Sequence, residues 1–171
     1  MGSTIVQGAR ARLVITFVLV AALGALACDD QGAFYDGPFR PLESQVVFSF
    51  FEAHDPWNDP QAPLVLSLLL ATETIYPCCN WHLATQHELG PASGRVELQG
   101  ILVPSTCLTA LGPAGAQLPW SLRNGTVPLR FVHGVVTDTY TLQVTDSTIA
   151  IVPAAGTLTR PRELLFRRPA R

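Results

Sequence analysis

Two adjacent cysteines stand close to two histidines near the middle of the chain. The stretch IYPCCNWH contains Cys78, Cys79 and His82, and His87 follows five residues after His82. Thiolate sulfur and imidazole nitrogen are ligands for zinc, and Cys79-x-x-His82 has an acceptable ligand spacing. Paired cysteines also suggest a redox centre or half of a structural disulfide. The rest of the sequence must decide among these three interpretations.

The metal and redox interpretations are the weaker ones. His82 and His87 are separated by an odd number of residues, so a straight strand sends their side chains to opposite faces. Adjacent cysteines are poor tetrahedral partners, and the chain has no second cysteine pair. A redox centre would read CxxC within a βαβ pattern. We therefore predict no metal site here, and keep a metal-binding protein that uses Cys78, Cys79 and His82 as an alternative.

A second candidate for metal binding is the acidic stretch EAHDPWNDP, residues 52–60. Asp55 and Asp59 supply carboxylate oxygens, which calcium prefers. Each aspartate precedes a proline, however, and Asp-Pro also initiates turns through backbone hydrogen bonding. We interpret this stretch as an exposed turn, and its use as a metal site belongs to the same alternative.

Motifs for catalysis and for nucleic-acid binding are missing from the sequence. The chain has no lysine, which excludes a Walker A loop, a pyridoxal Schiff base and a Ser–Lys catalytic pair. Ser93 in GPASG is one place off the GxSxG pattern of hydrolases. The net charge of −2 gives no basic surface for nucleic acid. We therefore predict no catalytic residue, no cofactor and no nucleic-acid partner.

The first 27 residues have the pattern of an export signal. Arg10 and Arg12 precede an uninterrupted run of apolar and small residues from Leu13 to Ala27. A helix of that length spans roughly 22 Å, which is short for a hydrocarbon core of about 30 Å. A charged start, a short apolar run and a small-residue end describe a secretory signal peptide.

The end of this segment, GALAC at residues 24–28, resembles the lipobox of bacterial lipoproteins. In that family the cysteine is modified with diacylglycerol and becomes the first residue after cleavage. Ala25 and Leu26 are swapped relative to the commonest pattern, so ordinary cleavage after Ala27 is the alternative. The resemblance implies a lipoprotein anchored to the bilayer through Cys28, at the inner or the outer membrane of the cell envelope. Two acyl chains are enough for stable anchoring.

Three cysteines remain for disulfide bonding once Cys28 is assigned to lipid. Export places them where disulfides form and persist. The Cα atoms of the neighbours Cys78 and Cys79 are fixed near 3.8 Å, below the usual disulfide range of about 4.4–6.8 Å. We therefore predict one bridge to Cys107, with Cys79 as the slightly preferred partner and Cys78 as the alternative. The cysteine left over is expected to be an unpaired thiol.

Apolar and polar residues alternate along most of the chain after residue 45. TVPLRFVH (126–133) and TDTYTLQVTD (137–146) place an apolar side chain at every second position, which is the period of a half-buried strand. No long stretch has the helical period. Asn124-Gly125 adds a hairpin or turn signal. Further predicted strands are 46–53, 63–75, 95–103 and 147–153.

This pattern predicts an all-β domain, an antiparallel sandwich of about seven or eight strands similar to immunoglobulin-like and fibronectin-type domains. The expected segments are a signal peptide 1–27, a lipidated cysteine with a flexible tether 28–45, the sandwich 46–153, and an arginine-rich tail or edge strand 154–171.

The sequence thus predicts a lipoprotein with a binding or structural role in the cell envelope, and with another envelope protein as a candidate partner. The alternatives are a metal-binding envelope protein and a protease-inhibitor-like sandwich.

Overall fold

The computed structural model describes residues 39–53 and 64–169, and all the regular elements in these ranges are β-strands. Cys28, the signal segment, Asp55 and Asp59 lie outside the described residues. Within the described ranges, no helix is long and apolar enough to cross a bilayer. The predicted all-β class is therefore confirmed for this part of the chain.

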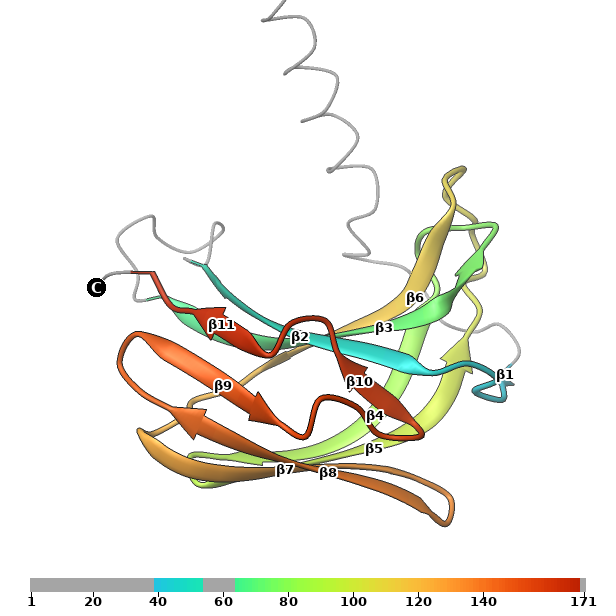
Figure 1. The fold of residues 1–171 in the computed structure, drawn as a ribbon. Coiled ribbons are helices and arrows are strands. Elements are labelled where there is room, and N and C mark those ends of the chain that lie inside the picture. The colour runs from blue at the N-terminus through green and yellow to red at the C-terminus, as the bar shows by residue number, and fades with distance from the viewer. Residues whose placement is uncertain (1–38, 54–63, 170–171) are drawn as a thin grey trace, which may run out of the picture.

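Eleven strands run through the described residues (Figure 1). Their bounds are β1 Phe39–Arg40, β2 Val46–Ala53, β3 Val65–Tyr76, β4 His82–Gly90, β5 Ser93–Leu102, β6 Gly112–Pro119, β7 Gly125–His133, β8 Val136–Val144, β9 Thr148–Val152, β10 Thr159–Pro161 and β11 Leu165–Arg167.

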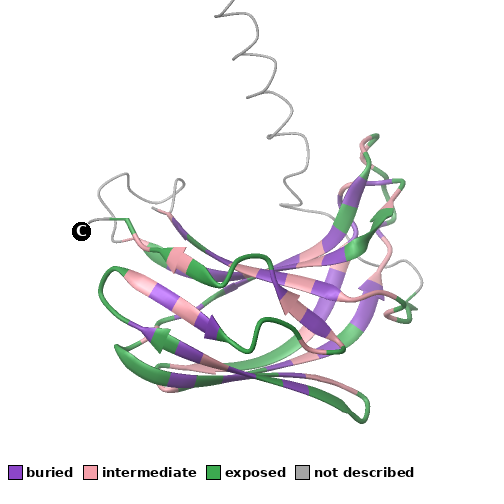
Figure 2. Cartoon of the chain, viewed as in Figure 1, coloured by how far each residue is buried: buried purple, intermediate pink, exposed green. Residues whose placement is uncertain are grey.

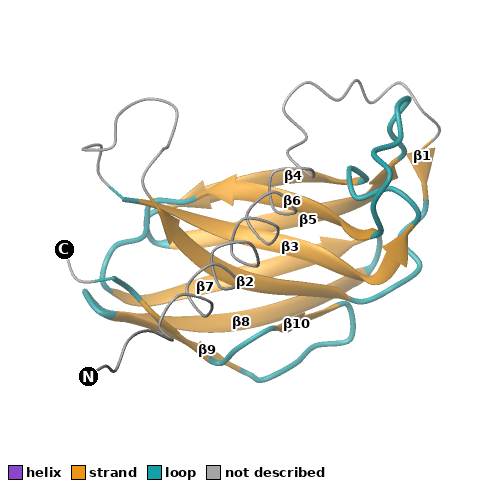
Figure 3. Ribbon diagram, turned by 90° about the horizontal axis from the view of Figure 1, so that it is seen from above, coloured by secondary structure: helices purple, strands orange, loops and turns teal. Residues whose placement is uncertain are grey.

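The strands form one sheet that curls back on itself, in the order β10-β2-β3-β6-β4-β5-β7-β8-β9-β11, with β1 added beside β5. Figure 1 shows β2, β3 and β6 in one layer and β7, β8 and β9 in the facing layer, and Figure 3 shows the same layers from above. Three pairings are parallel, β10 with β2, β4 with β6, and β5 with β7. The sheet is therefore mixed and has more strands than the predicted antiparallel sandwich.

The core fills the space between the two layers, and the residues that face it alternate along each strand (Figure 2). The ring of Phe48 on β2 lies 4.9 Å from the ring of Phe131 on β7 and 4.9 Å from that of Tyr140 on β8. All three side chains are almost fully buried. Burying a large apolar side chain stabilises a fold by about 1.5–3 kcal/mol, so these contacts hold the layers together. The inward faces predicted for 126–133 and 137–146 are confirmed.

A bulge in β5 lets the sheet turn the corner between the layers. The register with β4 shifts between Ala84 and Thr85, opposite Gly100. Gly100 has a φ of 146°, which is rarely adopted by residues with a side chain, and a Cβ there would collide with Phe39 and with the carbonyl of Arg40. Bulges bend a strand and increase its twist. Glycine at this position therefore permits both the bend and the close approach of β1.

The arginine-rich segment after residue 153 is part of the fold. β10 pairs with β2 and β11 pairs with β9, so the sheet extends beyond the predicted boundary of 46–153. Arg168 forms a two-pronged ion pair with Glu52, with nitrogen–oxygen distances of 3.1 and 3.2 Å. Both side chains are at least 95% buried, at 5% and 0% exposure. Within the segment predicted as a tail or an edge strand, β10 and β11 are the two strands at the ends of the sheet order.

Candidate functional site

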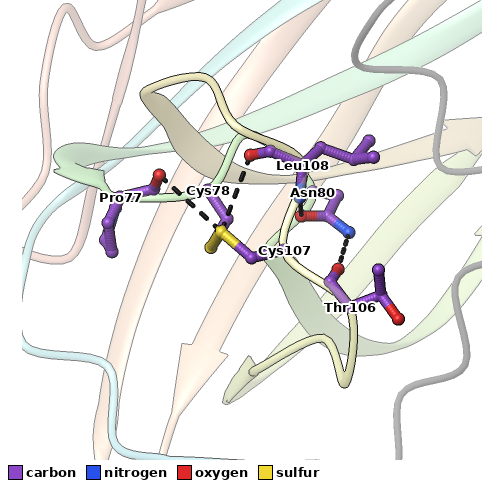
Figure 4. The surroundings of a disulfide bond; sticks show 6 residues. All are labelled: Pro77, Cys78, Asn80, Thr106, Cys107 and Leu108. Atoms are coloured by element: carbon purple, nitrogen blue, oxygen red, sulfur yellow. Dashed lines mark hydrogen bonds between the residues drawn. A yellow bond between two sulfur atoms is a disulfide. The ribbon is translucent and has the colours of Figure 1, made fainter.

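The IYPCCNWH stretch forms the end of β3, the turn after it and the start of β4. Cys78 in this turn is bonded to Cys107, with 5.3 Å between the Cα atoms (Figure 4). The preference for Cys79 as the partner of Cys107 is therefore wrong, and the alternative partner Cys78 is correct. The physical reason is the direction of the two side chains, because Cys78 is buried and meets the 103–111 loop. Cys79 is half-buried, and its Cβ lies against Gly112.

Asn80 ties the turn to the same loop by a second route. Its side-chain amide donates a hydrogen bond to the Thr106 carbonyl at 2.8 Å and accepts one from the Leu108 N–H at 3.3 Å (Figure 4). Asn80 is 5% exposed, so water competes little for these bonds. The bridge and Asn80 together make the Cys78 side of the turn a structural element.

Neither cysteine of the pair offers a thiolate. Cys79 is disulfide-bonded in the structure, like Cys78, and none of the described cysteines is free. The prediction of an unpaired thiol in the pair is therefore wrong. No group of three histidine, cysteine, aspartate or glutamate side chains in the described ranges is placed to hold a metal ion. His82 borders the groove described next, whereas His87 is exposed further along β4.

A groove of about 930 Å³ lies on the face of β2, β3 and β6 that is turned away from the core. This face is curved, as Figure 1 shows for the layer formed by these strands. The turn with Cys79 borders one part of the groove, and Arg160 and Arg162 border another. The volume falls within the range of roughly 300–1,000 Å³ that is common for small-molecule sites. The aliphatic and proline side chains that line it are Val47, Leu69, Ala71, Ile75, Leu111 and Pro113.

The floor of the groove is mainly aliphatic, with Ser49 and Gln117 as polar side chains in its lining, and the backbone of its central strand β3 is paired on both sides from Ser67 to Ala71. β2 pairs with β3 from Val46 to Ala53, and β3 pairs with β6 continuously from Ser67 to Ala71. A strand bonded on both sides uses its N–H and C=O groups within the ladder. Ile75 and Leu111 remain 57% and 76% exposed at one end. The middle of the groove, on β3, is therefore suited to an apolar group.

The two arginines at the border differ in ion pairing. Arg160 is ion-paired with Glu73, with both its Nε and its Nη2 atoms 2.7 Å from the same carboxylate oxygen. Arg162 is exposed, and among the described residues no carboxylate forms an ion pair with it. Its backbone N–H donates a hydrogen bond to the Phe48 carbonyl at 2.7 Å, which fixes it beside β2. The positive charge at the groove therefore belongs to Arg162.

Asp138 on β8 positions the segment that carries these arginines. Its carboxylate accepts hydrogen bonds from the backbone N–H groups of Thr157, Leu158 and Thr159, at 3.0, 2.8 and 2.6 Å. Burial alone raises the pKa of the Asp138 carboxyl, but the bonds from Thr159, Thr157 and Leu158 outweigh it and hold this pKa below its ordinary value. The 157–159 loop leads directly into β10, so this carboxylate sets where the border of the groove begins.

Sequence reasoning missed the groove, although one signal for it was present. VVFSFF in β2 and VLSLLLA in β3 are apolar on both faces of the strand. Such a continuous run indicates that both faces of the strand are covered or used. In β2 and β3 one face meets the core, and Val47, Leu69 and Ala71 on the other face line the groove.

The fold and the groove define an all-β protein with an apolar site on the outer face of its sheet. No family model matches the chain, and searches of curated proteins and of solved structures found no match. The groove and the N-terminal sequence are therefore the two features that bear on function.

Proposed function

We propose that this protein is a membrane-anchored lipoprotein of a bacterial cell envelope that binds a ligand in the groove on β2, β3 and β6 and has no catalytic activity. The observation that carries the proposal is the groove itself, because its aliphatic residues line an open site instead of packing into the core. The lipobox-like GALAC at residues 24–28 supports the anchor, with lipid on Cys28. Anchoring would hold the binding domain at the bilayer surface in the envelope.

The side chains around the groove support binding rather than catalysis. The Thr72 hydroxyl donates to the Thr74 carbonyl at 2.9 Å and accepts from the Ala114 N–H at 2.9 Å, so it is committed to the backbone. A hydroxyl nucleophile needs a base within hydrogen-bond reach, and Thr72 has backbone partners in that place.

The disulfide between Cys78 and Cys107 weakens the metal-binding alternative. Cys78 is bonded to Cys107, so its sulfur carries no charge for a metal ion. His82 would then have to bind without the Cys78 thiolate. Asp55 and Asp59, the other donors of that alternative, lie outside the described residues.

The anchor is tested by the intact mass and the location of the protein made in a bacterial host with a lipoprotein-processing pathway. We expect a diacylglyceryl adduct on Cys28 and recovery with membranes, whereas Cys28→Ser should lose the adduct. The sulfur of Cys28 can carry a lipid thioether or a disulfide, and not both. An unlipidated chain whose mass rises by about four daltons on reduction would contradict the anchor, because two bridges would use all four sulfurs.

The groove is tested with an uncharged naphthylamine dye that fluoresces in apolar surroundings. We expect the dye to bind the purified chain and Ala71→Trp to abolish binding, because Ala71 lies in the groove. Thr139→Trp is the matched control, since Thr139 is exposed on β8 in the facing layer. Equal dye binding by both variants would show that the groove is not the binding site.

A further inference from the structure

We infer that the ligand of this groove is a free single-chain anionic amphiphile of the long-chain carboxylate type, whose hydrocarbon lies on the β2–β3–β6 face and whose carboxylate pairs with Arg162. This inference rests on the proposed binding function and names its ligand. It follows from three properties of the groove, which are its mainly aliphatic floor, the paired backbone of its central strand, and the one arginine in its lining that has no ion pair among the described residues.

The aliphatic floor selects the body of the ligand. Val47, Leu69 and Ala71 present no donor or acceptor, and the ladder pairs occupy the backbone of the central strand. A peptide that adds to a sheet needs a free strand edge for its own N–H and C=O groups. The middle of the groove, on β3, is a sheet face and not an edge. Hydrocarbon gives up no hydrogen bonds on such a surface. Its transfer from water is favourable by about 25 cal/mol for each Å² of apolar surface that is buried.

The border of the groove selects the head of the ligand. Glu73 neutralises Arg160, whereas Arg162 is exposed and has no ion pair among the described residues. A guanidinium binds a carboxylate through two parallel hydrogen bonds. One uncompensated arginine matches one singly charged head. The charge and the apolar floor border the same groove, so one amphiphilic molecule can contact both.

The position of Arg162 is maintained by the fold. Its N–H is bonded to the Phe48 carbonyl, and Pro161 before it pairs in register with Phe48 on β2. Asp138 holds the loop that leads into β10. The backbone that presents the guanidinium is therefore ordered before the ligand arrives, which lowers the entropic cost of binding.

Equilibrium dialysis of the purified chain with isotope-labelled laurate and with dodecanol of the same chain length tests the inference, at concentrations below micelle formation. We expect laurate to bind more tightly than dodecanol. Arg162→Gln should weaken laurate binding about tenfold and leave dodecanol binding unchanged, because only the charged head uses the guanidinium. Arg167→Gln is the matched control, since Arg167 is an exposed arginine on β11 and does not line the groove.

The proposed ligand and the proposed binding site would be contradicted by different results. Equal affinity for laurate and dodecanol, with both lost in Ala71→Trp, would overturn the carboxylate contact and leave the groove as the binding site. Binding of laurate that Ala71→Trp does not alter would overturn both the ligand and the groove. Binding to phosphatidylglycerol vesicles that depends on Arg162, without binding of laurate, would overturn the choice of a free amphiphile and assign the charge to the bilayer surface.

Discussion

Asp138 accepts two hydrogen bonds from Thr159, one from its backbone N–H at 2.6 Å and one from its hydroxyl at 3.0 Å. Thr159 is fully buried, and its carbonyl also accepts a bond from the Tyr140 hydroxyl at 2.7 Å. Asp138 and Tyr140 stand two residues apart on the same face of β8. This pair of side chains therefore fixes the start of β10, and with it Arg160 and Arg162, to the opposite layer of the sheet.

Replacing Asp138 by asparagine should lower the free energy of unfolding by about 2–3 kcal/mol at pH 7, because the charged acceptor of several hydrogen bonds is lost. The role of Asp138 should also appear in how the free energy of unfolding depends on pH. The folded-state pKa of Asp138 lies below the ordinary value, so its contribution is fully present above the unfolded pKa of about 3.9 and is lost as the pH falls through the folded value. Urea unfolding between pH 7 and pH 2 should show that loss in the natural protein and a weaker one in Asp138→Asn.

Asp146 provides the control for the Asp138 experiment. Its carboxylate is exposed and accepts one bond, from the Asn124 side chain at 2.6 Å. Asp146→Asn should change the free energy of unfolding by less than about 1 kcal/mol. If both variants gave the same pH profile, the pH dependence would not come from the buried carboxylate.

The disulfide partner of Cys107 can be assigned by cleavage with trypsin under non-reducing conditions. The chain has no lysine, and Arg95 is the only arginine between Cys79 and Cys107, so cleavage there separates the two halves unless a bridge joins them. We expect the joined fragment to persist in Cys79→Ser and to disappear in Cys78→Ser, because the bridge uses Cys78.

Loss of that bridge should also destabilise the fold. Cys78 and Cys107 are 29 residues apart, and a loop of that size predicts a loss of about 3–4 kcal/mol in the free energy of unfolding when the bridge is removed. Denaturant unfolding of Cys107→Ser measures the loss.

In the trypsin experiment, a joined fragment that survives in Cys78→Ser would contradict the bridge between Cys78 and Cys107.

The buried ion pair between Glu52 and Arg168 should contribute far more than the exposed pair between Glu73 and Arg160. Arg168→Met leaves the Glu52 carboxylate buried without its guanidinium, which costs about 3–5 kcal/mol. Arg160→Met breaks a pair whose side chains are about 40% exposed, and the expected cost is below about 1 kcal/mol. Urea unfolding of the two variants checks the order, and a larger loss in Arg160→Met would refute it.

Two glycines on the β4–β5 hairpin should respond differently to alanine. A Cβ on Gly94 would lie 2.6 Å from the buried ring of Trp120, so Gly94→Ala should cost about 1–3 kcal/mol. A Cβ on Gly90 would meet only the Ser93 carbonyl at 3.7 Å, and Gly90→Ala should be neutral or stabilise by at most about 1 kcal/mol. Tryptophan fluorescence during unfolding measures both. Similar losses in the two variants would rule out contact with Trp120 as the cause.

Strands with clear alternation or with a continuous apolar run were predicted closely from the sequence, and a strand with neither signal was missed. The predicted 46–53 coincides with β2, and 126–133 and 137–146 match β7 and β8 within two residues. β6, with the sequence GPAGAQLP, was missed because glycine, proline and alanine have low strand propensity. Its place between β3 and β4 in the sheet supplies the pairing that its own residues do not favour.

The turn signal at Asn124-Gly125 correctly predicts a bend in the chain, and it does not predict which strands pair. Gly125 begins β7 with a φ of 123°, so the local bend is present. The strands on its two sides do not pair, because β6 lies beside β3 and β4 while β7 lies beside β5 and β8. A turn signal indicates where the chain bends. Which strands meet after the bend depends on contacts with distant residues.

By itself, the sequence determined the all-β class, the inward faces of the best strands and a bridge from Cys107 to the cysteine pair, because each depends on local periodicity or on the number of cysteines. Only the tertiary structure decided that Cys78 is the partner, that the arginine-rich end joins the sheet, and that an apolar groove meets Arg162. These features join residues that are 29 to more than 100 positions apart. Their geometry depends on how the whole sheet curls, and no local pattern encodes that curvature.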